Sequence, residues 1–304
     1  MNITTNKDQV PLVSICCITY NHAPFIKQCL DGFLMQKTTF PIEILIHDDA
    51  STDGTDDIIR EYASAYPGVI FPLFEVENQY SKPGHKHMDL YNYERAKGKY
   101  IAYCEGDDYW TDPLKLQRQV NFLEAHEDYS VCWHRYQRFY WQENTWKEDD
   151  CGKVLRPNED GVEIDIATYL SGWYTQPLTM VFRKSCFDFQ WNNKYKFYRD
   201  EHEQYHLLTV GRGYLFGYIG GVYVIHGGGV YGAQNTQIQS RTSCAVAEEL
   251  YQNNKNDLTK GFYEKALQWA IYQHRTDFPR KFFYSWRQFA LSWKLKLFLK
   301  NLWR

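Results

Sequence analysis

The sequence has few of the features that mark membrane-spanning, metal–thiolate or nucleic-acid-binding proteins. No stretch approaches the roughly 18 consecutive apolar residues of a membrane-spanning helix, and residues 1–10 are polar, with no apolar signal segment. No two of the 8 cysteines have the C-x-x-C spacing of a zinc or thioredoxin-type site. The formal net charge is only −3, which argues against binding nucleic acid through bulk positive charge.

The 304 residues do contain ample apolar and aromatic material for a core. A chain of this length can form one large domain or two small ones. Apolar residues make up 44% of it, which is enough for a core, and aromatic residues make up 17%. Aromatic rings stack on bases and sugars, but they fill cores more often. Cysteines such as Cys16 and Cys17 lie inside apolar runs, which is typical of small buried hydrophobes in a reducing compartment. We therefore expect a cytoplasmic protein.

Strands and helices alternate through the first 130 or so residues. Apolar runs predict buried parallel strands at 12–19, 42–47, 69–76 and 100–104. Apolar residues at helical spacing follow three of these strands, from residues 24, 55 and 112. Polar clusters end the same three strands, at 20–22, 48–53 and 105–108. Because open α/β sheets bind ligands at the carboxyl ends of their strands, we expect these clusters to form one site.

The second half of the chain has a looser pattern. It predicts strands at 131–141 and 179–182 and a helix at 199–210. Residues 142–159 are polar and loop-like, and the stretch 211–232 is glycine-rich and in principle mobile. Residues 282–303 are basic and aromatic at near-helical spacing.

Carboxylates at two of the strand ends could carry chemistry. Glu105, Asp107 and Asp108 place three carboxylates within four residues, and hard oxygen ligands suit Mg²⁺ or Mn²⁺. A solvated acidic turn that caps the next helix explains the same spacing. Asp48 and Asp49 could accept a hydrogen bond from a base or a ribose hydroxyl, although turn formation explains them equally well.

Three motifs occur in order within the first 110 residues. Residues 11–15, Pro-Leu-Val-Ser-Ile, lead to Thr-Tyr-Asn at 19–21, and residues 48–55 read Asp-Asp-Ala-Ser-Thr-Asp-Gly-Thr. Lys-Gly-Lys-Tyr-Ile at 97–101 is followed by Glu-Gly-Asp-Asp-Tyr-Trp at 105–110. Together they resemble the opening, the Asp-Asp-Gly-Ser-Thr-Asp-Gly-Thr segment and the Asp-x-Asp region of family 2 glycosyltransferases, which have the GT-A fold. The resemblance is good over 11–129, weaker to about 231, and does not cover the C-terminal tail.

The resemblance implies transfer of a sugar, with inversion, from a nucleotide-diphosphate sugar, with a UDP-sugar favoured and Mn²⁺ or Mg²⁺ as cofactor. It assigns six positions to nucleotide-sugar binding: Thr19, Tyr20, Asn21, Asp48, Glu105 and Gly106. Asp107 is implied to ligate the metal directly. Glu105 stands where the family has Asp. Because Glu is longer by one methylene, it is expected to approach the ribose, or the metal through water.

Two further roles come from the second half by the same resemblance. The family's catalytic acid corresponds to Asp200 or Glu201, with Asp200 favoured, and it would take the proton from the acceptor hydroxyl. A solvated helix start is the alternative. His226 lies in a segment similar to the family's Tyr-x-Ile-His and is expected to complete the metal site, although a lone His is more often a core or loop residue. The glycines at 227–229 fit a loop that closes over the donor.

The expected fold is α/β: a GT-A-like, Rossmann-type, mainly parallel sheet flanked by helices, with a C-terminal helical extension. Residues 1–10 would be a polar tail, and 11–231 the glycosyltransferase domain. That domain divides into a nucleotide-sugar half, 11–129, and an acceptor half, 130–231. Residues 232–304 would form the extension.

The expected acceptor is a glycan or a lipid-linked molecule in surface glycan biosynthesis, and no nucleic acid is expected as a partner. A basic amphipathic helix at 282–303 could contact the inner face of the membrane or pack against the domain. Two other functions stay open. A sugar nucleotidyltransferase should have a glycine- and arginine-rich phosphate loop, which 15–21 is not. A non-catalytic family member would only bind a glycan or a partner.

Overall fold

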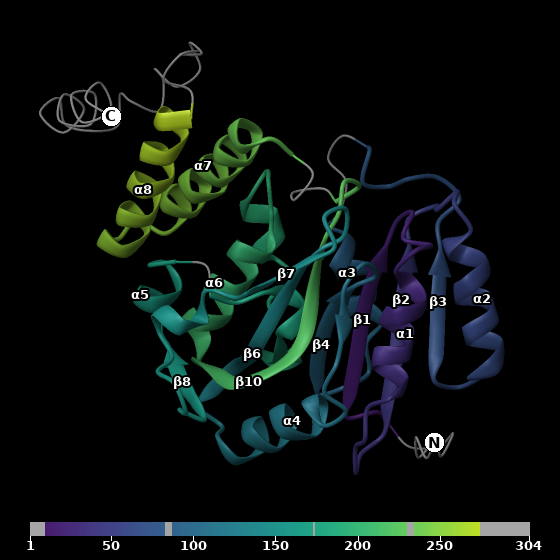
Figure 1. Cartoon of the computed structure of the whole chain (residues 1–304). Coiled ribbons are helices and arrows are strands. Elements are labelled where there is room, and N and C mark those ends of the chain that lie inside the picture. Colours follow the sequence, from purple (N-terminus) through teal and green to yellow (C-terminus); the bar gives the residue numbers. More distant parts are fainter. Residues whose placement is uncertain (1–9, 83–86, 173, 230–233, 274–304) are drawn as a thin grey trace, which may run out of the picture. The chain divides into compact units, whose positions relative to one another are not determined.

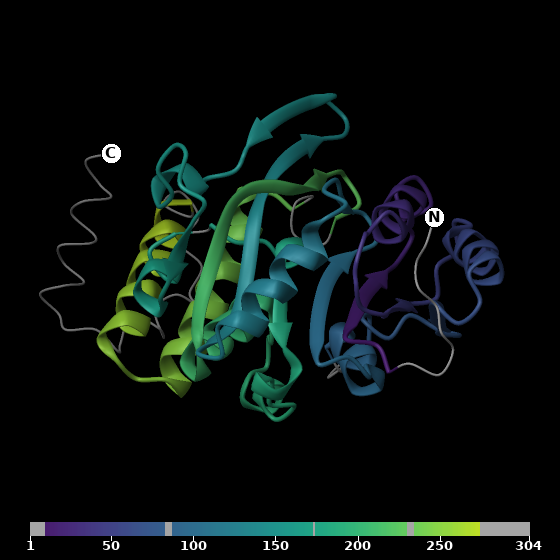
Figure 2. The same ribbon diagram turned by 90° about the horizontal axis from the view of Figure 1, so that it is seen from below.

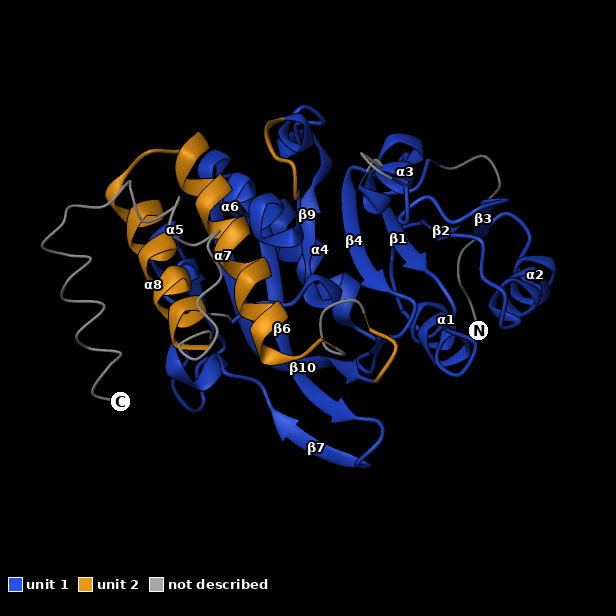
Figure 3. Cartoon of the chain, turned by 90° about the horizontal axis from the view of Figure 1, so that it is seen from above, with its two compact units in different colours: residues 1–193, 198–226 blue, residues 194–197, 227–304 orange. Residues whose placement is uncertain are grey.

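The computed structural model describes residues 10–82, 87–172, 174–229 and 234–273. The chain forms two compact units, shown in different colours in Figure 3. Unit 1 comprises Met1–Asn193 and Tyr198–His226, and unit 2 comprises Lys194–Phe197 and Gly227–Arg304. Every predicted site residue belongs to unit 1. The predicted basic helix at 282–303 lies outside the described residues.

The first half of unit 1 is a parallel sheet built from the apolar runs. Its strands are β1 (Val13–Thr19), β2 (Ile42–Asp48), β3 (Ile70–Phe74) and β4 (Tyr100–Glu105). They lie in the order β3-β2-β1-β4, and every neighbouring pair is parallel. β1 and β2 are buried along nearly their whole length, as continuous apolar strands of a parallel sheet should be. The four predicted strands are confirmed with small differences at their ends.

Helices cover both faces of this sheet, as Figure 2 shows. Alternate residues of β1, including Ile15 and Cys17, share one core with α1 (Ile26–Leu34), α2 (Thr55–Ala65) and α4 (Lys115–Ala125). On the other face α3 (Met88–Arg95) contacts β1 and β2. The side chain of Asn92 donates to the Cys17 carbonyl at 2.8 Å, which ties α3 to β1.

The second half of unit 1 extends the sheet and makes it mixed. β9 (Val181–Arg183) runs antiparallel between β4 and β6 (Tyr129–Tyr140), and β6 pairs in parallel with β10 (Arg212–Ile225). β5 (Tyr109–Trp110) and β8 (Gly161–Ile164) pair antiparallel with β10. Two reversals of direction therefore bring β6 and β10 back to the direction of β4. The carboxyl ends of β1, β2, β4, β6 and β10 all lie at one edge of the sheet (Figure 1).

The remaining elements of unit 1 are mostly short. α6 (Asp200–Val210) matches the predicted helix and contacts β6 and β10. The short helices are α5 (Ile166–Tyr169) and the 3-10 turns Cys151–Lys153, Pro177–Thr179, Lys184–Cys186 and Trp191–Lys194.

The structure differs from the expectations in three places. The stretch 211–232 is not mainly a loop, because β10 occupies 14 of its residues. The pairing of β10 with β6 shifts register between Phe216 and Ile219 and again before Gly221, so bulges absorb the glycines. The predicted loop 142–159 contains the exposed strand β7 (Thr145–Glu148). The helix α3 had no counterpart in the sequence interpretation.

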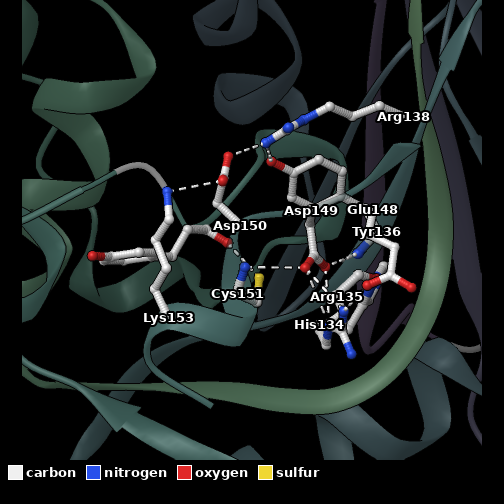
Figure 4. Close-up of polar contacts among 10 residues, drawn as sticks. His134, Arg135, Tyr136, Arg138, Glu148, Asp149, Asp150, Cys151 and Lys153 are labelled. Atoms are coloured by element: carbon white, nitrogen blue, oxygen red, sulfur yellow. Dashed lines mark hydrogen bonds and ion pairs between the residues drawn. The ribbon is translucent and has the colours of Figure 1, made fainter. Parts of the chain in front are cut away.

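Ion pairs tie the hairpin of β6 and β7 to the segment that follows it (Figure 4). The side chain of Asp149 is fully buried, and its carboxylate accepts hydrogen bonds from Nε and Nη2 of Arg135 at 3.1–3.2 Å. It also accepts the backbone N–H groups of Tyr136 and Cys151. Arg138 contacts Asp150 at 2.5 Å. The buried carboxylate thus has several partners, which holds the base of the hairpin rigid.

Unit 2 contains two long helices, α7 (Thr236–Asn253) and α8 (Asp257–Gln273). They share a small separate core that includes Cys244, Ala247, Tyr263 and Leu267. The helical C-terminal extension is therefore confirmed as far as residue 273. Among the described residues, no helix combines the length and apolar character needed to cross a membrane.

Candidate active site

The loops that follow β1 and β2 are bonded to each other. Asn21 has a φ of 54°, a left-handed conformation that Asn tolerates. Its backbone N–H donates to Ser51 Oγ at 2.9 Å, and its Oδ1 accepts the Thr52 N–H at 2.8 Å. The Ala23 N–H donates to Asp53 Oδ2 at 3.0 Å. These contacts fix the predicted nucleotide-binding residues of the two loops relative to each other.

Asp48 and Asp49 end β2 with different partners. Asp48 accepts both the Ser51 backbone N–H, at 3.1 Å, and the Ser51 hydroxyl, at 2.5 Å. Burial raises the pKa of Asp48, although the two bonds from Ser51 act in the opposite direction. Asp49 accepts the backbone N–H groups of Gln79 and Tyr80 at 2.7 and 3.0 Å, so it holds the loop after β3. The side chain of Tyr20 is 44% exposed, which leaves its ring available for stacking.

The end of β4 lies against the end of β1 without room for a side chain. A Cβ on Gly106 would come within 2.7 Å of Thr19 Oγ1 and 2.8 Å of Thr19 Cβ. Thr19 is buried, and its hydroxyl has no hydrogen-bond partner among the described residues. The Gly106 backbone N–H donates to the Ile18 carbonyl at 2.9 Å. Glycine at 106 therefore lets the acidic turn lie directly beside the loop after β1.

Asp107 lies between two imidazoles. Its Oδ2 is 2.9 Å from His226 Nε2 and 3.6 Å from His22 Nε2. Burial acts to raise the pKa of Asp107, but the two histidines outweigh it, and the pKa lies below its ordinary value. The ligand atoms of His22, Asp107 and His226 all lie within 4.8 Å of one another, which is close enough for one metal ion.

Glu105 and Asp108 complete a second, overlapping cluster with Asp107, also within 4.8 Å. Asp108 is 1% exposed and accepts the Val224 N–H at 2.8 Å, so it ties the turn to β10. Burial raises the pKa of Glu105 well above its ordinary value, and the charges of Asp107 and Asp200 add to this. The influence of Asp200 on Glu105 indicates that the start of α6 lies near this cluster.

Asp200 and Glu201 are consecutive carboxyl groups in the first turn of α6, and each affects the pKa of the other. Burial raises the pKa of both, and for Glu201 the neighbouring Asp200 raises it further. The neighbouring Glu201 acts in the opposite direction on Asp200 and lowers its pKa. The two neighbours therefore act on each other in opposite senses: Asp200 raises the pKa of Glu201, and Glu201 lowers that of Asp200.

The sheet edge thus brings together residues that are far apart in the sequence. Thr19, Asp48, Glu105, Asp107 and His226 each lie at or just after the carboxyl end of a strand. The sequence interpretation missed His22. It lies in a polar turn, and no spacing signal links it to Asp107 or His226. Phe25, whose ring centroid is 4.5 Å from that of His226, also went unnoticed.

Two proteins with similar sequences match part of this chain. Over 122 residues it is 47% identical to an uncharacterized protein of Mycobacterium tuberculosis, covering 40% of this chain and 34% of that protein. Over 116 residues it is 36% identical to the UDP-Glc:alpha-D-GlcNAc-diphosphoundecaprenol beta-1,3-glucosyltransferase WfaP of Escherichia coli, covering 38% and 42%. The matches span about a third to two fifths of the length of these relatives.

Two solved structures share the fold over most of the chain. One is TarS of S. aureus in complex with UDP-GlcNAc, with a TM-score of 0.60, 16% identity, and coverage of 87% of this chain and 74% of that one. The other is the mannosyltransferase PcManGT from Pyrobaculum calidifontis in complex with GDP-Man and Mn²⁺, with a TM-score of 0.58, 16% identity, and coverage of 99% and 90%. The predicted GT-A fold is confirmed. Residues 14–218, about two thirds of the sequence, match Glycosyl transferase family 2, and the chain belongs to that family.

Proposed function

We propose that the protein transfers a sugar from a nucleotide-diphosphate sugar to an acceptor hydroxyl, with inversion at the anomeric carbon. The observation that carries the proposal is the position of Asp107, between His22 and His226 and close to Glu105, at the carboxyl edge of the sheet. Membership of the family supports the reaction class. A UDP-sugar is the favoured donor, because WfaP uses UDP-Glc and TarS binds UDP-GlcNAc.

The residues at this edge fit a divalent cation, Mn²⁺ or Mg²⁺. Asp107 would be a direct ligand, with His226 and Glu105 as further candidates. Carboxylate oxygens and a neutral imidazole are suitable donors for such an ion. The Thr19 hydroxyl at this edge is buried without a hydrogen-bond partner among the described residues, so it has bonding capacity left for a ligand. When bound, the cation would neutralise charge on the departing nucleotide diphosphate.

Asp200 would act as the general base. Its carboxylate would take the acceptor hydroxyl proton while the acceptor oxygen bonds to the anomeric carbon and the bond to the diphosphate breaks. A carboxylate whose pKa is raised by burial is a better base than an exposed one. The neighbouring Glu201 would favour the ionised form of Asp200, whose pKa it lowers.

The nucleotide would bind across the ends of β1 and β2. Tyr20 would stack on the base, and Asp48 would accept a hydrogen bond from the base or the ribose, beside Asn21. The carboxylate of Asp48 can accept more bonds than the two that Ser51 donates. Thr19 and Gly106 would shape the floor of this pocket.

A glycan or lipid-linked acceptor in surface glycan biosynthesis is the proposed second substrate, since WfaP acts on a sugar linked to diphosphoundecaprenol. The reaction would then take place in the cytoplasm, at the inner face of the membrane. Unit 1 offers one feature that suits a sugar ring. Trp141, 46% exposed, packs edge-on against Phe25 with ring centroids 4.9 Å apart, and Phe25 contacts His226.

Calorimetric titration with UDP, GDP and dTDP, with and without Mn²⁺, tests the proposal. We expect metal-dependent binding of one nucleotide, with UDP favoured. Binding should be lost in Asp107→Ala and kept in the control Asp57→Ala, which changes an exposed carboxylate of α2. Failure to bind any of the three nucleotides would favour a non-catalytic binding module. Conversion of a sugar phosphate and a nucleoside triphosphate to a nucleotide sugar would favour a nucleotidyltransferase.

A further inference from the structure

His22 faces the same carboxylate oxygen as His226. The Nε2 atoms of the two histidines lie 3.6 and 2.9 Å from Asp107 Oδ2. The three ligand atoms are all within 4.8 Å of one another. They come from the loop after β1, the turn after β4 and the end of β10, so three separate parts of the sheet edge converge on one point.

The local structure holds the His22 ring in this position. The carbonyl of His22 accepts the backbone N–H groups of Phe25 and Ile26, at 2.9 and 2.8 Å, at the entrance to α1. Its ring lies edge-on to those of Phe25 and His226, with centroids 6.5 and 5.9 Å apart. The side chain is 15% exposed, and Nδ1 has no hydrogen-bond partner among the described residues. The ring is therefore fixed by packing, with Nε2 directed at Asp107.

We propose that His22 is a third protein ligand of the divalent cation, together with Asp107 and His226. This inference rests on the proposed function. Two imidazoles and one carboxylate form a mixed nitrogen and oxygen donor set, which suits transition-metal ions better than an all-oxygen set does. Mg²⁺ prefers oxygen ligands and water. The site should therefore prefer Mn²⁺ over Mg²⁺, whereas Glu105, Asp107 and Asp108 without the histidines would not discriminate in this way.

A simpler explanation of the contact is that both histidines only donate hydrogen bonds to Asp107. In that case the cation would be bound by the carboxylates of Glu105, Asp107 and Asp108. Removing His22 would then leave the number of nitrogens bound to the cation unchanged. The two arrangements differ in how many imidazole nitrogens bind the metal, which can be measured directly.

The test uses the full-length chain with Mn²⁺ and UDP, followed by electron paramagnetic resonance. Titration of free Mn²⁺ gives the affinity, and pulsed measurements count the imidazole nitrogens on the bound ion. We expect two nitrogens in the wild-type protein and one in His22→Ala, with Mn²⁺ affinity reduced at least about tenfold. The preference for Mn²⁺ over Mg²⁺ should fall in the same variant. His126→Ala removes an exposed histidine and should change neither result.

Each outcome bears on one of the two proposals. A single nitrogen in the wild-type protein, or wild-type Mn²⁺ affinity in His22→Ala alongside loss in Asp107→Ala, would reject His22 as a ligand and leave the proposed function standing. No Mn²⁺ binding by the wild-type protein, with or without UDP, would reject both. The nitrogen count in the wild-type protein decides the question even if His22→Ala does not fold.

Discussion

At the scale of single residues, the acidic turn depends on close contact between two backbone segments. Gly106 lies so close to Thr19 that even a methyl group would overlap it, at 2.7 Å from Oγ1. Asp107 and Asp108 follow immediately and point to different partners, the histidines and the backbone of β10. A shift of this turn by a fraction of an ångström would therefore disturb both the candidate metal site and the anchor on Val224.

Gly106→Ala should weaken both folding and ligand binding. Forcing a methyl group into this contact should lower the free energy of unfolding by about 1–3 kcal/mol and abolish metal-dependent nucleotide binding. Chemical denaturation and calorimetry would measure the two effects. Gly261→Ala, in α8 with nothing within 4 Å of the added Cβ, is the control and should be neutral or stabilising. Unchanged nucleotide affinity in Gly106→Ala would contradict the proposed role of the turn.

Lys115 should make stability depend on pH. It is fully buried, its Nζ lies 3.9 Å from the centre of the Trp110 ring, and burial lowers its pKa to about 7. The unfolded chain keeps this lysine protonated up to about pH 10. Between these values the unfolded state binds more protons, so the lysine costs less stability as the pH rises. Below pH 7 it exerts its full cost.

Lys115→Met removes this cost and retains most of the buried volume. The variant should be more stable than the wild-type protein, and its advantage should be about 2.7 kcal/mol larger at pH 6 than at pH 9. Urea denaturation of both proteins at the two pH values measures the free energies of unfolding. Subtracting the wild-type value from the variant's at each pH cancels the contribution of every group that titrates in both proteins. An advantage independent of pH would show that Lys115 keeps its charge throughout this range, stabilised by the face of Trp110.

At the scale of elements, the sequence predicted the sheet better than its coverings. Apolar runs such as 12–19 are typical of strands buried on both faces, because such strands admit few polar residues. The helix α3 was missed because two of its buried residues, Asp89 and Asn92, are polar and obscure the helical pattern. β10 was not predicted as a strand because its glycines usually mark turns, whereas here they lie at bulges. His22 could not be assigned since its partner is on another strand end.

The hairpin of β6 and β7 carries exposed aromatic rings next to the candidate site. Trp141 and Trp146 are 46% and 51% exposed, but only Trp141 touches Phe25 and so lies near His226. The Trp141 backbone N–H donates to the Ile225 carbonyl at 2.9 Å, and this bond together with the Phe25 contact holds the Trp141 ring in place. A rigid ring beside a sugar-transfer site can bind the face of an acceptor sugar.

Trp141→Ala should raise the acceptor KM by about tenfold and leave UDP affinity unchanged. Loss of one aromatic stacking contact is worth about 1–1.5 kcal/mol, which corresponds to that factor. Trp146→Ala, which removes a similarly exposed ring farther along the hairpin, should have a smaller effect. Steady-state kinetics with varied acceptor, together with calorimetry of UDP, would separate the two substrates. Equal effects of both variants would mean that the hairpin binds the acceptor elsewhere or not at all.

At the scale of the whole molecule, the chain divides into a unit that holds the candidate site and a unit with its own small core. All the residues proposed to bind the nucleotide and the metal belong to unit 1, which ends at His226. The cluster formed by α7 and α8 consists of buried apolar residues and contains none of the candidate ligands. Ligand binding free energy should therefore act mainly on unit 1.

Hydrogen exchange in the presence of Mn²⁺ and UDP tests this division. Ligands protect amides in the segments that they hold in place, because local opening must then break the ligand contacts. We expect slower exchange in peptides that cover 19–22, 48–53, 105–108 and 222–226, and no change in peptides from within Thr236–Asn253 or Asp257–Gln273. Asp107→Ala should remove the protection. Strong protection of α7 or α8 at saturating ligand would mean that unit 2 contributes to donor binding, so that the catalytic unit could not be confined to residues up to His226.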